Sequence, residues 1–423
     1  MEGYQYTWER SRGTVDWVEE RLDRALVSST WLSLFPKASV VSLEAMCSDH
    51  LPIFLDPSSH HQFPRIQRFR FENVWLREPD CKEVVAKSWE LSSGCPIQSK
   101  LLFCGSALMR WGGHLACDFV NRLASCKQKM GSLKGCRDQT SVADFLESRK
   151  CYNELLHNHE VFWKQRSKSL WLKEGDMNSR LRNSSGQWCS NPAEVNSLIG
   201  EYFSKLFHSE GSISAEIISC VATKITTAQN QKLLEPFTAT DVRDALFSMH
   251  PDKSPGPDGM NPAFFQNFWH IVGGDVTAAC LHFIDTCEFP DELNATAIVL
   301  VPKKSNPEYL ADLRPITLCN VLYKIVAKML ANRMKAVLSS IITENQSAFV
   351  PGRAITDNIL ISAEIMHYLK RKRQGKTGIA ALKIDMSKAY DRIEWGFLKA
   401  MMLKLRFVAR WVELIFLCFY CHL

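Results

Sequence analysis

The 423-residue sequence lacks a long apolar segment and has no strong excess of charge of either sign. Its first residues, MEGYQYTWERSRGTVDW, contain no apolar core of a secretory signal, and the apolar run WVELIFLCFYCHL is too short for a membrane span. The formal charge of +6 allows a polyanionic partner without requiring one. We therefore expect an intracellular protein with no membrane contact, in either the nucleus or the cytoplasm.

Closely spaced, recurring cysteine pairs are also missing, although the chain has fifteen cysteines. Their scatter predicts reduced thiols rather than a disulfide framework or a zinc site. Cys418, Cys421 and His422 match the spacing used for covalent haem attachment. Without an export signal, chance is the better interpretation of that match.

The length exceeds that of one ordinary core and predicts two or three domains. Short β-like runs within 38–55 and a helix-like TWLSLF before Pro36 are typical of an α/β layer that ends near residue 60. Residues 61–235 are predicted to form a mostly helical linker, with one long amphipathic helix over 140–172. No internal repeat or low-complexity segment is present.

The pattern changes near residue 236, where the third segment, 236–423, begins. Thr240 is a candidate cap for a helix that starts at Asp241. A rigid Pro-Gly-Pro-Asp-Gly turn at 255–259 precedes a helix rich in Phe and Trp. The β-like ATAIVLVPK and the helical NVLYKIVAKMLANRMKAVLSSI follow, so the chain as a whole is predicted to be α+β.

A strand followed by a helix is predicted over 379–405. Apolar residues alternate with Lys383 and Asp385 in the strand, and beyond Ser387 apolar residues recur every three to four positions. Asp385 thus lies where a strand opens into a helix. Nucleotidyl transfer uses two divalent ions held by carboxylates, and Asp385 is a candidate magnesium ligand. An aspartate at a strand end more often caps a turn.

The segment LKIDMSKAYDRIEW resembles the first palm motif of reverse transcriptases from LINE-type, non-LTR retrotransposons, which are abundant in plant genomes. Asp385, Lys388, Ala389, Tyr390 and Asp391 fill its Asp-x-x-Lys-Ala-aromatic-Asp pattern. KSPGPDGMNPAFFQNFW and ENQSAFVPGRAITDNIL resemble earlier motifs of that family, in its order. The resemblance covers 236 to about 410. It implies the fingers and early palm of an RNA-directed DNA polymerase that uses Mg²⁺, an RNA template, a DNA primer or target, and deoxynucleoside triphosphates.

The resemblance also implies roles for single residues. Asp385 would bind metal, and the ring of Tyr390 would lie under the incoming sugar and exclude a 2′-hydroxyl; the alternative for Tyr390 is a core aromatic. Lys303 and Arg314 would hold the triphosphate, or else be solvated surface charges.

Arg353 and Lys388 would contact nucleic acid, although an arginine in Arg353's place can also tether a turn. Asp391 is expected to be structural. The basic run 369–376 would face template phosphates, with a solvated linker as the alternative.

The first segment is similar to the carboxyl end of the apurinic-endonuclease-like domain that precedes the polymerase in these elements. That resemblance implies that His50 is a general base, that Asp23 orients its imidazole, and that Asp49 lies near a metal or the scissile phosphate. A histidine beside an aspartate is more often structural.

Both catalytic domains are expected to be partial in this chain. The nuclease family's metal-binding glutamate should lie upstream of this segment, and no Tyr/Phe-x-Asp-Asp tetrapeptide follows Asp385. We therefore expect a truncated chain that is inactive as a polymerase by itself. The alternatives are a nucleic-acid-binding remnant without catalysis and a phosphodiester endonuclease.

Overall fold

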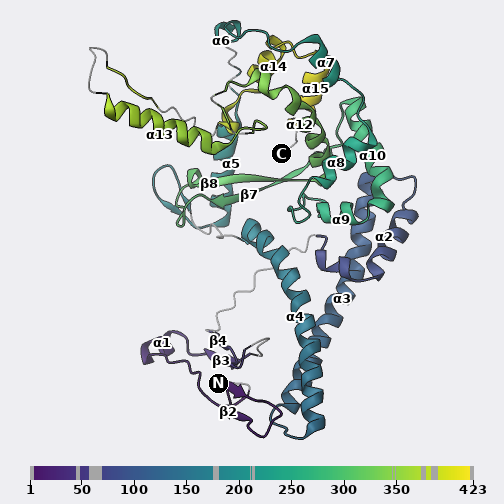
Figure 1. Ribbon diagram of the computed structural model, residues 1–423, viewed down its shortest axis with the longest axis vertical. Coiled ribbons are helices and arrows are strands. Elements are labelled where there is room, and N and C mark those ends of the chain that lie inside the picture. The colour runs from purple at the N-terminus through teal and green to yellow at the C-terminus, as the bar shows by residue number, and fades with distance from the viewer. Residues whose placement is uncertain are drawn as a thin grey trace. The chain divides into compact units, whose positions relative to one another are not determined.

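The computed structural model describes residues 4–43, 48–56, 69–174, 181–209, 211, 215–344, 346–347, 349–372, 378–382 and 389–419. Helices dominate these residues, together with two-stranded antiparallel sheets, so the fold is α+β as predicted (Figure 1). The chain divides into two compact units, 1–81 with 106–166, and 82–105 with 167–423. This division differs from the three segments predicted from sequence, whose bounds stay a prediction.

Two short hairpins form the strand part of the first unit. Strand β1 (Trp8–Arg10) pairs with β2 (Val18–Glu20), and β3 (Ser39–Ser42) pairs with β4 (Ile53–Asp56). Helix α1 (Ser29–Leu34) lies between them in sequence and is capped by the Ser28 hydroxyl, which accepts from the Trp31 amide. The β-like runs and the short helix predicted for this region are confirmed.

The helical part of the first unit consists of residues 106–133 of α3 (Ile97–Leu133) and 139–166 of α4 (Gln139–Glu174), which are joined by a short turn. Helix α4 confirms the long helix predicted over 140–172. The first unit also contains the 3₁₀ turn η1 (Asn73–Arg77). Arg12 packs against this helical part, with its guanidinium 4.6 Å from the Trp17 ring centre and 4.2 Å from that of Phe145.

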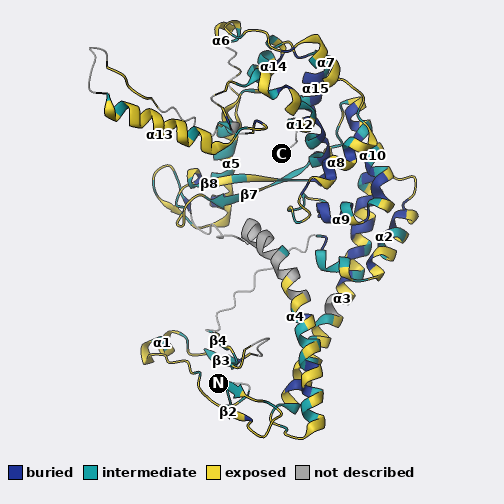
Figure 2. Cartoon of the chain, in the orientation of Figure 1, coloured by how far each residue is buried: buried dark blue, intermediate teal, exposed yellow. Residues whose placement is uncertain are grey.

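The second unit has a core of packed helices. Its centre is formed by α8 (Ala239–Phe247), α10 (Trp269–Thr286), α12 (Val321–Ile341) and α15 (Ala409–Leu417), whose facing residues are buried (Figure 2). The remaining helical elements are α2 (Asp80–Leu91), α5 (Pro192–Phe207), α6 (Ala215–Ser219), α7 (Thr227–Leu233), α9 (Pro262–Asn267), α11 (Asp291–Asn294), η2 (Leu310–Asp312), α13 (Ile355–Arg371), η3 (Tyr390–Arg392) and α14 (Trp395–Lys404).

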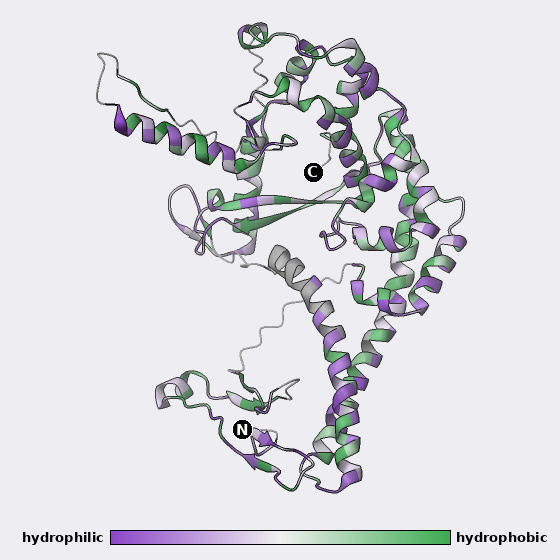
Figure 3. Ribbon diagram, viewed as in Figure 1, coloured by the Kyte–Doolittle hydropathy of each residue, from purple (hydrophilic) through white to green (hydrophobic). Residues whose placement is uncertain are grey.

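Two strands rich in apolar residues, β7 (Thr296–Pro302) and β8 (Leu313–Cys319), form an antiparallel hairpin (Figure 3). In sequence, this hairpin comes between α10 and α12. Because side chains alternate along a strand, Leu300 and Leu313 share one face. That face packs with residues of α5 and of the small sheet formed by β5 (Leu181–Arg182) and β6 (Trp188–Cys189). The strand predicted at 295–303 and the helix predicted at 320–341 are confirmed.

Residues 224–230, at and before α7, are joined to residues 405–408 by hydrogen bonds. The amides of Lys224 and Ile225 both donate to the carbonyl of Leu405, at 3.3 and 3.0 Å. The Asn230 side chain donates to the Arg406 carbonyl at 2.7 Å and accepts from the Val408 amide at 3.1 Å. Part of the predicted linker is therefore bonded to the segment that follows the palm motif.

Two local predictions were wrong. Thr238, not Thr240, caps α8, because its hydroxyl accepts from the Asp241 amide while the Asp241 carboxylate accepts from the Thr238 amide. The helix expected directly after Ser387 begins only at Trp395, since the 3₁₀ turn η3 and an extended Ile393 precede it.

The predicted Pro-Gly-Pro-Asp-Gly turn is confirmed. The Gly259 amide donates to the Gly256 carbonyl at 3.0 Å, and Gly259 has φ +74°. A Cβ on Gly256 would lie 2.4 Å from the Asn320 nitrogen, so only glycine fits where this turn meets α12. No helix among the described residues is long and apolar enough to cross a membrane.

Candidate functional site

Backbone pairing in the first unit brings Asp23 and His50 together. The Leu51 amide donates to the Thr7 carbonyl at 2.7 Å, and Trp8 forms a bridge with His50. The buried Thr7 hydroxyl accepts from the Asp23 amide at 2.8 Å. His50 Nδ1 then lies 2.9 Å from Asp23 Oδ2.

This hydrogen bond changes the titration of both groups. The bond from His50 lowers the pKa of Asp23, and the bond to Asp23 raises the pKa of His50. With Nδ1 donating to the carboxylate, Nε2 is the ring nitrogen that can accept a proton from water. The pair therefore has the arrangement of a general base and its orienting carboxylate.

Asp49 lies next to His50 but points to a different partner. Its Oδ2 accepts from Trp8 Nε1 at 2.9 Å, and this bond lowers the pKa of Asp49. Its carbonyl accepts from the Glu9 amide at 3.0 Å. The three residues expected to form a nuclease site are thus close in space.

Two candidate triphosphate contacts lie at one end of the β7–β8 hairpin. Arg314 pairs with Val301 and is exposed on the face opposite Leu300 and Leu313. Lys303 follows β7; its amide donates to the Asp312 carbonyl, and its Nζ donates to the Ala311 carbonyl at 2.8 Å. Two cations at one strand end can neutralise a polyphosphate.

Arg353 is held by backbone carbonyls after α12. Its guanidinium donates to the carbonyls of Thr343, Gln346 (2.6 Å) and Ile342 (3.4 Å). These bonds support the alternative that Arg353 tethers a turn, and its contact with nucleic acid stays a prediction.

Several predicted residues lie outside the part of the chain that the structure describes. These are Asp385, Lys388, residues 373–376 of the basic run, Cys421 and His422. The backbone of Tyr390 begins η3, but its side chain is outside that part too. Within the described residues, no group of three or more His, Cys, Asp or Glu could hold a metal ion.

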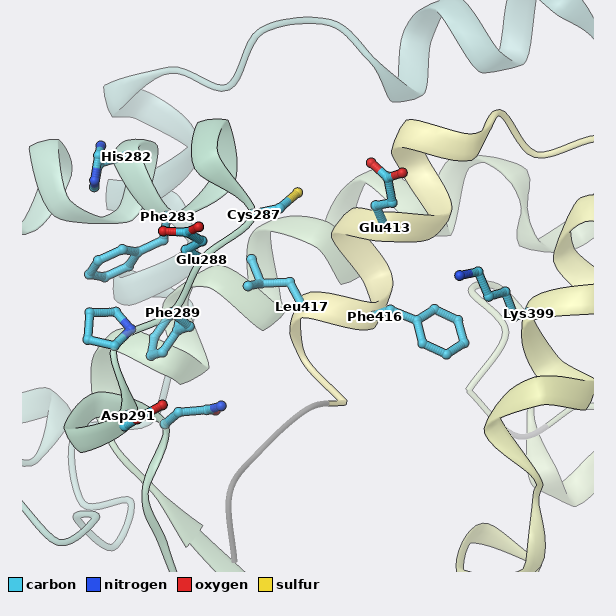
Figure 4. Close-up of a pocket in the computed structure, with 12 residues that line it drawn as sticks. His282, Phe283, Cys287, Glu288, Phe289, Asp291, Lys399, Glu413, Phe416 and Leu417 are labelled. Atoms are coloured by element: carbon cyan, nitrogen blue, oxygen red, sulfur yellow. The ribbon is translucent and has the colours of Figure 1, made fainter. Parts of the chain in front are cut away.

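Sequence reasoning missed a cavity of about 670 Å³ in the second unit (Figure 4). Helices α14 and α15 line it together with the end of α10 and the residues that follow. Lys399 and Phe416 lie on one side, with the Lys399 Nζ 6.0 Å from the centre of the Phe416 ring. No residue predicted for the polymerase or nuclease sites lines this cavity. Its walls come from segments more than 100 residues apart, so no sequence signal could have found it.

A second feature missed from sequence is the carboxyl group of Asp258, in the Pro-Gly-Pro-Asp-Gly turn. The residue is half-buried, but its Oδ2 is shielded from solvent and has no hydrogen-bond partner in the described part of the chain. Its Oδ1 accepts from the Met260 amide at 3.0 Å. Burial raises the pKa of Asp258 to about 7, against the opposing effects of that hydrogen bond and of Lys324.

Comparison with known proteins finds a family match in the last third of the chain. Residues 301–421 match the family described as reverse transcriptase (RNA-dependent DNA polymerase). The 149 kDa uncharacterized protein of transposon TX1 from Xenopus laevis is 26% identical over 415 residues, which cover 90% of this chain and 31% of that protein.

Two similar proteins come from Drosophila melanogaster. The probable RNA-directed DNA polymerase from transposon BS is 24% identical, over 40% of this chain and 18% of its own length. The retrovirus-related Pol polyprotein from the type-2 retrotransposable element R2DM is 26% identical, over 38% and 14%.

This chain spans about a third of the length of the TX1 protein and less than a fifth of the other two. The expected likeness to plant elements stays a prediction. The family match over 301–421 and these relatives support the prediction of a LINE-type, non-LTR retrotransposon reverse transcriptase.

Proposed function

We propose that this chain contributes to RNA-directed DNA synthesis, with Asp385 as a ligand of catalytic Mg²⁺. The observation that carries the proposal is the reverse transcriptase match over 301–421, which contains every polymerase residue that the motifs single out. Reverse transcriptases as a family use a divalent metal. The substrates are an RNA template, a DNA primer or target, and deoxynucleoside triphosphates.

Each residue has a distinct part in this proposal. Lys303 and Arg314 neutralise the triphosphate from one end of the β7–β8 hairpin. Tyr390 lies under the sugar and selects deoxynucleotides. Lys388, Arg353 and the basic run 369–376 contact the template and primer, where Lys and Arg side chains release phosphate counterions.

A site for two magnesium ions needs more carboxylates than Asp385 alone supplies. Binding of the nucleotide therefore tests the roles of Lys303 and Arg314 more directly than catalytic turnover does. We expect Lys303→Ala and Arg314→Ala each to weaken the binding of a deoxynucleoside triphosphate to the chain with an RNA–DNA primer–template by about tenfold, as for loss of one charge-assisted hydrogen bond. Lys304→Ala is the matched control, because Lys304 Nζ pairs with Asp312 at 2.9 Å. Equal affinity in all variants would remove both residues from the triphosphate site.

Primer extension on an RNA template separates polymerisation from binding alone. A product that depends on Mg²⁺ and is lost in Asp385→Asn would establish catalysis by this chain. Salt-dependent retention of RNA without product would instead support a nucleic-acid-binding role without catalysis.

We propose phosphodiester hydrolysis as a second function of the first segment, on the strength of the 2.9 Å Asp23–His50 hydrogen bond. His50 would take a proton from the attacking water, Asp23 would hold the imidazole, and Asp49 would lie near the metal or the scissile phosphate. This proposal adopts the likeness to the end of an apurinic-endonuclease-like domain. Metal-dependent nicking of a supercoiled plasmid should be lost in His50→Ala and retained in His208→Ala, a matched change at an exposed histidine. Equal nicking by both variants would assign the activity elsewhere.

A further inference from the structure

Two cysteines meet in the helical part of the first unit. Cys126 lies on α3 and Cys151 on α4, and the Cys126 thiol donates a hydrogen bond to Cys151, with 3.7 Å between the two Sγ atoms. A disulfide needs the sulfurs at about 2.05 Å, so the thiols have to approach by only about 1.7 Å. Small side-chain rotations can provide an approach of that size.

The packing of the two helices explains why these thiols face each other. On α3, Leu123, Cys126 and Met130 recur at helical spacing, and Met130 is buried. On α4, Ser148 and Leu155 flank Cys151 and are buried. Both cysteines sit on the inner stripes of an antiparallel helix pair, so their separation is set by packing rather than by flexible loops.

Both cysteines are half-buried rather than enclosed. A small oxidant can therefore reach them, whereas the fully buried Cys104 and Cys280 are shielded. We propose that Cys126 and Cys151 form a site of reversible oxidation, at which a hydroperoxide converts the two thiols into a disulfide that joins α3 to α4. This site is separate from both proposed catalytic functions.

The chemistry balances with one molecule of hydrogen peroxide. The thiolate of one cysteine attacks an oxygen of the peroxide, forming a sulfenic acid and releasing water after proton uptake. The second thiol then attacks the sulfenic sulfur, which forms the S–S bond and releases a second water. A thiol reductant reverses the reaction by exchange, which is compatible with cysteines that are reduced under ordinary cellular conditions.

The electrostatic surroundings set the pH dependence of this reaction. Burial raises the pKa of Cys126, with further raising by Cys151, while Arg122 and Lys129 lower it. The thiolate is the reactive form, so oxidation should speed up as the pH rises above neutrality.

The test is peptide mapping of the intact chain after exposure to hydrogen peroxide and alkylation of the remaining thiols. We expect one dominant cross-linked peptide pair that contains Cys126 and Cys151, with both thiols recovered after reduction. The oxidised chain should also show a higher Tm than the reduced chain, because the link closes a loop between two helices.

Three variants sharpen the test. Cys126→Ser and Cys151→Ser should each abolish the link, and Cys136→Ser should retain it, because Cys136 lies in the turn of the same helix pair and contacts the Ser132 carbonyl instead. The peptide map of the unaltered chain tests the proposal even if a variant fails to fold. Alkylation of both thiols after peroxide treatment, or cross-links distributed among unrelated cysteines, would overturn the proposal.

Discussion

The hydrogen bond between Asp23 and His50 links the protonation of two side chains that lie 27 residues apart in sequence. Each group favours the charged form of the other. Because the pKa of His50 is raised in the folded state, the stabilisation from this pair is fully present below the ordinary histidine pKa. It is lost as the pH rises through the folded-state value.

Asp23→Asn should lower the pKa of His50 toward its ordinary value, because the charged hydrogen-bond acceptor is removed. An NMR titration of the His50 ring measures this shift directly. Asp16→Asn is the control, since Asp16 is an exposed carboxylate in the same unit. An unchanged His50 titration in Asp23→Asn would mean that the two side chains do not pair in solution.

The shielded carboxyl group of Asp258 gives a pH dependence in the second unit. Its pKa is raised to about 7 in the fold, so its contribution to stability is greatest below the unfolded-state pKa and is lost as the pH rises through about 7. Asp258→Asn should therefore raise the free energy of unfolding at pH 8 by on the order of 1–3 kcal/mol, with a smaller gain at pH 5.

Denaturant unfolding at the two pH values measures the effect at Asp258. Asp244→Asn, at a carboxylate on the exposed side of α8, provides a comparison in which no such pH-dependent gain is expected. A gain of equal size at both pH values would contradict titration of Asp258 as the cause.

Sequence motifs predicted which side chains of the first segment would meet, but not the burial of Asp258. Asp23 and His50 were paired because their short motifs resemble the end of an apurinic-endonuclease-like domain, a likeness that stays a prediction. The turn that carries Asp258 is bonded to a residue far along the chain, because the Asn320 side chain, just before α12, accepts from the Asp258 amide across 62 residues. Such a contact leaves no local pattern in the sequence.

At the scale of elements, the start of α8 shows how local capping decides a boundary. Thr238 and Asp241 satisfy each other's amides in a capping box, whereas Thr240 lies inside the helix. The sequence contains two threonines two positions apart, and spacing to the carboxylate distinguishes them. The residue three positions before Asp241 is the cap, which a capping-box search would have selected.

Thr238→Ala should destabilise the second unit by about 1 kcal/mol, because the Asp241 amide loses its acceptor. Thr240→Ala should be close to neutral or slightly stabilising, because alanine has the higher helix propensity. Thermal unfolding of the two variants beside the unaltered chain compares them. Equal losses in both would place the helix start elsewhere.

On the scale of the whole molecule, the two units should unfold as separate cooperative steps. Phe145 belongs to the first unit and Leu313 to the second, and each is 2% exposed. Phe145→Ala should lower the stability of one transition by about 3–5 kcal/mol, and Leu313→Ala that of the other by about 2–5 kcal/mol. Calorimetry resolves the two steps. A single transition shifted by both changes would show that the chain unfolds as one body.

Individual elements were predictable from sequence, but the grouping of elements into units was not. Periodicity identifies α4, β7 and α12, because each buries one regular face. It does not report which partner covers that face. Residues 82–105 and 106–166 are neighbours in one predicted linker, yet they belong to different units.

The hydrogen bonds that join residues 224–230 to 405–408 decide where a recombinant polymerase fragment should start. A fragment begun at 236, where the motifs begin, or at 301, where the family match begins, would leave the Leu405 and Arg406 carbonyls and the Val408 amide without these partners. It would also remove the buried side chains of Ile225 and Leu233 and expose the surface that covers them. A fragment that starts before Leu181 keeps the small sheet, α5 and α7, and one that starts before Lys82 also keeps residues 82–105, which belong to the same unit.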